Sequence, residues 1–107
     1  MKKDILKIIE ASEKFLASEI TALNLLDRID SIYTVNLYGH VDRNKMEEEL
    51  YFLVQEYFDV ANKCVQNSER KGQKIIVHIN EQKLRNVVEI YTAKLREFIR
   101  INSAHIS

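Results

Sequence analysis

The stretch DRNKMEEELYFLVQEYFDVANKCVQNSERK, residues 42–71, carries the longest uninterrupted amphipathic helix pattern in the chain. Its apolar residues recur in steps of three and four, a spacing that stacks side chains on one face of a helix. They are Met46, Leu50, Leu53, Val54, Tyr57, Phe58, Ala61, Cys64 and Val65. Asp42 is a typical N-cap, and Arg70, Lys71 and Gly72 supply the cations and the glycine that favour a helix end. We therefore predict a helix over residues 42–71, with its C-terminal half, Tyr57 to Val65, in the core.

Two further helices flank this stretch. On the N-terminal side, two adjacent apolar stripes predict a helix over residues 3–37 with a wide buried face. One stripe holds Ile5, Ile9, Leu16, Ile20 and Leu23, and the other holds Ile8, Phe15, Ala22, Leu26, Ile29 and Tyr33. On the C-terminal side, Asn80 is a suitable N-cap for a third helix over residues 80–102. Its apolar face contains Leu84, Val87, Val88, Tyr91, Leu95, Phe98 and Ile99, and residues 103–107 are expected to form a tail.

These helices predict an all-α fold. The chain has 107 residues, no proline and two glycines, which fits one domain of a few long helices better than a fold with many turns. We expect an antiparallel, up-down-up bundle of three helices spanning residues 1–107. The alternative is an α+β fold in which residues 32–38 and 74–79, rich in β-branched and aromatic side chains, form strands on either side of the central helix. A parallel sheet of two strands has too few neighbours to be stable alone, which favours the bundle.

Composition points away from nucleic acid and membranes. The 16 basic and 16 acidic residues cancel, so no global field attracts an anionic partner. Neither a signal peptide nor a run of about 20 apolar residues is present, and we expect a cytoplasmic protein. Cys64 is the single cysteine, which excludes a disulfide within the chain and favours a buried thiol. Abundant isoleucine, lysine and asparagine suggest a bacterial or phage origin.

Motifs of known chemistry are missing from the sequence. It contains no glycine-rich phosphate loop, no serine hydrolase elbow, no His-Glu-x-x-His and no cysteine pair. The three histidines, His40, His78 and His105, are far apart along the chain, so we predict no metal site. No catalytic residues, cofactor or small-molecule substrate are predicted, and the expected protein is not an enzyme.

Helix lengths predict a surface for another protein. At about 1.5 Å per residue, the first two predicted helices span about 45 Å each and the third about 33 Å, so one end of the hairpin would stay uncovered. That end holds Tyr33, Tyr38, Met46, Leu50, Tyr51 and Phe52, of which Phe52 interrupts the polar face of its helix. Aromatic residues and methionine are enriched in protein interfaces. We therefore expect an interaction module, an adaptor, inhibitor or assembly protein, that binds a second copy of itself or a different protein. Alternatively, these residues cap the core of the monomer.

Two other functions are left open. Arg85, Arg96 and Arg100 lie within a narrow angle of the third predicted helix and could contact nucleic acid, although Glu89 among them would repel phosphate.

The second alternative comes from a short motif near the C-terminus. Residues 100–105, Arg-Ile-Asn-Ser-Ala-His, have the Arg-x4-His spacing of HEPN domains, and the chain resembles these small helical proteins in this motif. Many HEPN domains are ribonucleases in which the arginine and the histidine contact the scissile phosphate. The resemblance covers six residues, and Ile101 replaces the polar residue that usually follows the arginine. It implies a HEPN-like ribonuclease with Arg100 and His105 at its site.

Overall fold

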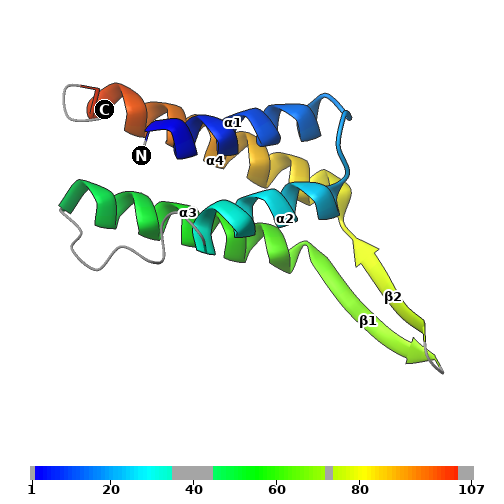
Figure 1. Ribbon diagram of the computed structural model, residues 1–107. Coiled ribbons are helices and arrows are strands. Elements are labelled where there is room, and N and C mark those ends of the chain that lie inside the picture. Colours follow the sequence, from blue (N-terminus) through cyan, green and yellow to red (C-terminus); the bar gives the residue numbers. More distant parts are fainter. Residues whose placement is uncertain (1, 35–44, 72–73, 104–107) are drawn as a thin grey trace.

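Four helices form the body of the protein in the computed structural model (Figure 1). They are α1 (Lys2–Leu16), α2 (Ala22–Ile32), α3 (Lys45–Lys63) and α4 (Glu81–Ile101). The structure describes residues 2–34, 45–71 and 74–103. The all-α prediction therefore holds for the packed body, but the predicted number of three helices is wrong.

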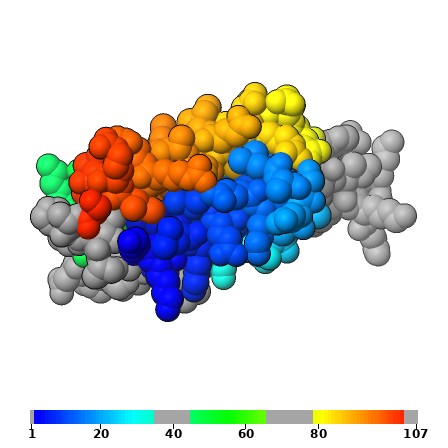
Figure 2. Space-filling view, turned by 90° about the horizontal axis from the view of Figure 1, so that it is seen from above, coloured from blue at the N-terminus to red at the C-terminus, as the bar shows by residue number. Residues whose placement is uncertain are grey.

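The helices run alternately up and down and form a closed bundle (Figure 1). Helix α1 packs against α2 and α4, and α3 packs against the same two helices, so each helix has two neighbours. Figure 2 shows α1 and α4 side by side along one face. Antiparallel neighbours joined by short connections are typical of up-and-down helical bundles.

The predicted helix over residues 3–37 is divided in two by a turn at residues 17–21. At the end of α1, the backbone N–H of Ser18 donates to Phe15 O and that of Glu19 donates to Lys14 O, at 2.9 and 2.8 Å. This pair of bonds is the Schellman arrangement, whose left-handed position is here Ser18, with φ 62°. Thr21 then caps α2, because its Oγ1 accepts a hydrogen bond of 3.1 Å from Asn24 N. The two apolar stripes predicted for one helix thus belong to two antiparallel helices.

The predicted helix over residues 42–71 is also shorter than expected. Helix α3 ends at Lys63, and the chain continues into a hairpin of two antiparallel strands, β1 (Val65–Lys71) and β2 (Lys74–Ile79), which points away from the bundle (Figure 1). Val65 pairs with Ile79 and Lys71 with Lys74, and the register is irregular between Asn67 and Glu69. Asn67 and Ser68 are weak helix formers, and the β-branched run at 75–77 offers this segment a strand partner. The predicted caps Asp42 and Gly72 lie outside the described residues.

The predicted strands have different outcomes. Residues 74–79 do form a strand, whereas Ile32 ends α2, Tyr33 and Thr34 continue its helical turn, and residues 35–38 lie outside the described part. The partner of β2 is β1, in antiparallel orientation, so the predicted parallel βαβ unit is wrong.

The third predicted helix agrees closely with α4. Asn80 is its N-cap, and Asn80 Oδ1 accepts a hydrogen bond of 3.2 Å from Lys83 N. Asn80 N also donates to Cys64 O at 2.9 Å, which joins the start of α4 to the end of α3. Of the predicted tail, Ser103 is described and residues 104–107 are not.

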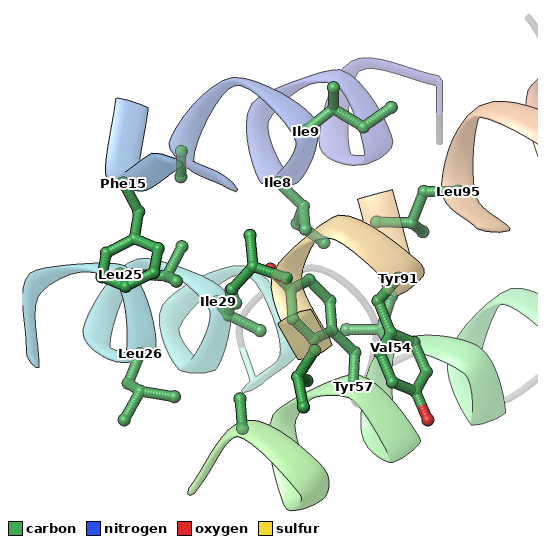
Figure 3. Packing of buried hydrophobic residues seen from close by; sticks show 14 of the residues in the cluster. Ile8, Ile9, Phe15, Leu25, Leu26, Ile29, Val54, Tyr57, Tyr91 and Leu95 are labelled. Atoms are coloured by element: carbon green, nitrogen blue, oxygen red, sulfur yellow. The ribbon is translucent and has the colours of Figure 1, made fainter. Parts of the chain in front are cut away.

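A single hydrophobic cluster contains side chains from all four helices (Figure 3). Tyr57 and Tyr91 stack within it, with ring centroids 5.1 Å apart and planes within 3° of parallel. Tyr57 and Ala61 are fully buried and Cys64 is nearly so, which confirms the C-terminal half of the central stretch as core. Cys64 is a free, buried thiol, as predicted.

Candidate functional site

An aromatic cluster joins the end of α2 to the outer surface of α3. The Tyr33 and Tyr51 rings stack with centroids 5.0 Å apart, and Tyr33 Oη donates a hydrogen bond of 2.6 Å to Tyr51 Oη. Phe52 lies edge-on to Tyr51, with centroids 5.6 Å apart. Tyr33 and Tyr51 are half-buried, but the Phe52 side chain is 55% exposed. The Phe52 ring therefore contacts Tyr51 on one side and is open to solvent on the other.

A shallow groove of about 460 Å³ continues from Phe52 along α3. It is lined by Phe52, Gln55, Glu56, Asp59, Val60 and Lys63. The groove thus combines apolar surface with two carboxylates and one ammonium group. We refer to this groove, together with the exposed face of Phe52, as the Phe52 surface.

Two other residues of the predicted contact surface belong to the core or pack against it. Leu50 is fully buried in the core, Met46 is partly buried against it, and Tyr38 lies outside the described residues. The length argument that grouped them is wrong, because α4 has 21 residues and α3 has 19, about 32 and 29 Å. The C-terminal end of α4 lies at the same end of the bundle as the N-terminal end of α3 (Figure 1). Helix α4 therefore extends along this end of α3, and no uncovered end of the kind predicted is left there.

Beside the Phe52 surface runs the seam between α3 and α4. Burial raises the pKa of Tyr91, and the negative charge of Glu56 on α3 raises it further. Lys94 Nζ on α4 lies 4.7 Å from the centre of the Tyr91 ring. Glu56, Tyr91 and Lys94 therefore meet at the outer side of this seam.

Two exposed isoleucines of α4 were not recognised from the sequence. The Ile90 side chain is 54% exposed and that of Ile101 is 64% exposed. Their separations from Lys94, four and seven residues, place all three along one line of the helix. This spacing is the feature of the sequence from which their common line on the helix could have been recognised.

Three hydroxyl groups lie inside the core. Ser12 Oγ donates a hydrogen bond of 2.8 Å to Ile8 O, and it lies 2.7 Å from Tyr57 Oη. Because a serine hydroxyl has one hydrogen, Tyr57 is the donor to Ser12. Burial raises the pKa of Tyr57 to about 12, although the nearby hydroxyls of Ser12 and Thr92 act to lower it. Thr92 Oγ1 is buried and makes no hydrogen bond to any described residue. All three side chains are buried, so this cluster serves the core and has no access to a substrate.

The three arginines of the predicted nucleic-acid face are engaged within the molecule. Arg85 donates to Leu16 O and to Ser18 Oγ, each at 3.0 Å, and its guanidinium lies 5.3 Å from the centre of the Phe15 ring. Arg85 thus fastens the turn between α1 and α2 to α4.

Arg96 and Arg100 face carboxylates. Arg96 pairs with Glu13 on α1 and Arg100 with Glu97 on its own helix. The positive charges of Arg96 and Arg100 are therefore partly neutralised, which weakens an attraction for phosphate. Of the HEPN-like pair, Arg100 is held by Glu97, and His105 lies outside the described residues.

A second cleft, of about 260 Å³, lies between α1 and α2. It is lined by Lys7, Glu10, Arg28, Ser31 and Ile32, and Glu10 pairs with Lys14 at 3.1 Å. All but Ile32 are exposed, so the cleft is a wide surface depression.

Within the part of the chain that the structure describes, no group of three or more histidine, cysteine, aspartate or glutamate side chains is placed to bind a metal ion. The helices of that part are too short or too polar to cross a membrane. Comparison with protein-family models, with curated proteins and with solved structures finds no match to this chain. The functional inference therefore depends on the geometry of the described residues.

Proposed function

We propose that the chain is a non-enzymatic interaction module of the cytoplasm, which binds another protein through the Phe52 surface of α3. The observation that carries this proposal is the exposed Phe52 ring, which lies edge-on to Tyr51 of the Tyr33–Tyr51 stack. An aromatic side chain that is already ordered loses little conformational freedom on binding and gains a large contact area. Such residues dominate the binding energy of many interfaces.

The surroundings of Phe52 support a protein as the ligand. The adjoining groove is shallow and open, whereas small molecules are usually enclosed in concave, mostly apolar pockets. Glu56, Asp59 and Lys63 line the groove beside the apolar groups. An apolar centre with a polar rim is the usual composition of a protein interface.

The test compares two substitutions of equally exposed apolar residues. Phe52→Glu changes the proposed surface, and Leu23→Glu changes a residue on α2 whose side chain is 52% exposed. Tagged wild type and both variants would be used to capture proteins from the source cells, with circular dichroism as a check on folding. We expect wild type and Leu23→Glu to retain the same bound protein and Phe52→Glu to lose it. Equal capture by all three proteins would contradict the proposal.

A further inference from the structure

Two stripes of side chains flank the outer side of the α3–α4 seam. The α3 stripe consists of Phe52, Glu56 and Val60, and the α4 stripe of Lys83, Ile90, Lys94 and Ile101. Residues four and seven positions apart lie on one line of a helix, which defines each stripe. Both stripes border the seam, because Glu56 and Lys94 meet at Tyr91. Three of the six large exposed hydrophobic side chains of the described residues belong to these stripes, so apolar surface is concentrated here.

The stripes carry charges of opposite sign. Glu56 in the α3 stripe is joined by Asp59 and Lys63, which line the same groove and leave it one net negative charge, and the α4 stripe contains Lys83 and Lys94. None of these five groups forms an ion pair with another residue that the structure describes. The seam thus presents an α3 groove with one net negative charge beside an α4 stripe with two positive charges, and the two are complementary in sign.

We propose that the partner of this surface is a second copy of the chain, bound so that α3 of one protomer lies on α4 of the other. A two-fold axis parallel to the helices, in the plane of the interface, produces this contact twice. Glu56 and Asp59 then face Lys94 of the partner subunit, and Phe52 and Val60 lie against the partner's Ile90. The proposal rests on the proposed function, because it identifies the partner of the same surface.

Charge selects this arrangement over the other symmetric one. A two-fold axis perpendicular to the helices would place α3 on α3 and α4 on α4, which brings carboxylates against carboxylates and ammonium groups against ammonium groups. Opposed like charges disfavour an interface, whereas complementary charges fix its register. A second copy supplies the basic, apolar stripe that the acidic α3 stripe requires.

The experiment uses two charge reversals, Glu56→Lys and Lys94→Glu, and their mixture. In the homodimer of either variant, position 56 of each chain faces a charge of the same sign at position 94 of the other chain. In the mixed dimer, both contacts between positions 56 and 94 join opposite charges. Charge repulsion within each variant chain is the same in its homodimer and in the mixed dimer. The change on mixing therefore reports only the contact between the chains. Asp27→Lys, the same change of charge on the exposed side of α2, is the matched control.

Sedimentation at high micromolar concentration gives the outcome. We expect wild type and Asp27→Lys at twice the 12.6 kDa of the chain. Each reversal alone should weaken the dimer about tenfold or more, and the equimolar mixture should regain it. A monomeric wild type, or a mixture no more dimeric than its components, would overturn the proposal. If the wild type is monomeric yet its capture of another protein depends on Phe52, self-association is wrong and the proposed function stands.

Discussion

Ser12, Tyr57 and Thr92 place three hydroxyl groups in an otherwise apolar core, and they differ in how well they are satisfied. The hydroxyls of Ser12 and Tyr57 form a continuous chain to Ile8 O, whereas that of Thr92 has no partner among the described residues. A buried polar group without a hydrogen bond destabilises a fold, but replacing it by an apolar group of the same shape removes that penalty. The stability of the core therefore depends on which hydroxyl is removed.

Opposite effects are expected for two substitutions in this cluster. Ser12→Ala leaves the Tyr57 hydroxyl without its acceptor and should lower the free energy of unfolding by about 1–3 kcal/mol. Thr92→Val keeps the side-chain shape and should leave that free energy unchanged or raise it. Urea unfolding of both variants beside the wild type measures the difference. A loss in Thr92→Val as large as that in Ser12→Ala would show that Thr92 has a hydrogen-bond partner.

Stability should also depend on pH through Tyr57. Its pKa is about 12 in the folded protein and is expected near 10 in the unfolded chain. Between these values the unfolded chain loses the proton first, so the wild type should lose up to about 1.4 kcal/mol of stability per pH unit. Below pH 10 the contribution is fully present. Tyr57→Phe lacks the group, and the stability difference between wild type and variant should shrink from pH 10 upward. A difference that stays constant to pH 11.5 would contradict the raised pKa.

At the scale of elements, the predictable parts are those in which local signals agree with packing. Helix α4 was predicted to within about a residue, because the Asn80 cap and the apolar spacing from Leu84 to Phe98 indicate the same boundaries. The turn at residues 17–21 was missed because Ser18 adopts the left-handed conformation at which a helix often ends. Glycine usually occupies that position, and a serine in the sequence does not indicate it. The hairpin was missed for a different reason. Residues 65–71 and 74–79 become strands by pairing with each other, and the apolar spacing of one segment does not indicate that pairing.

The start of α2 gives a test of this account of the turn. Thr21→Ala removes the oxygen that accepts from Asn24 N and should lower the free energy of unfolding by about 1 kcal/mol. Thr21→Ser keeps an acceptor at the same position and should retain most of the wild-type stability. Thr21 is exposed, so little buried surface is lost in either variant. Thermal unfolding of the three proteins decides the matter; equal losses in both variants would mean that the hydroxyl does not cap the helix.

At the scale of the whole molecule, only part of the proposed contact surface could be predicted. Phe52 interrupts the polar side of a helical pattern, and local sequence is sufficient to indicate its exposure. The burial of Leu50 depends on how the four helices lie along one another. That arrangement results from the division of the first predicted helix and from the hairpin after α3, neither of which was predicted. Ile90 and Lys94 gain their significance from lying beside α3, a relation that no single helix reveals. The surface is a property of the assembled bundle.

The central claim, a protein contact at Phe52, is tested most directly by photo-crosslinking in the source cells. A photoreactive amino acid placed at position 52 should produce a specific adduct, either of two copies of the chain or of the chain with another protein. The same group at position 23, an equally exposed site on α2, should not produce that adduct. If position 52 yields no adduct, or the same adducts as position 23, α3 does not carry the contact surface.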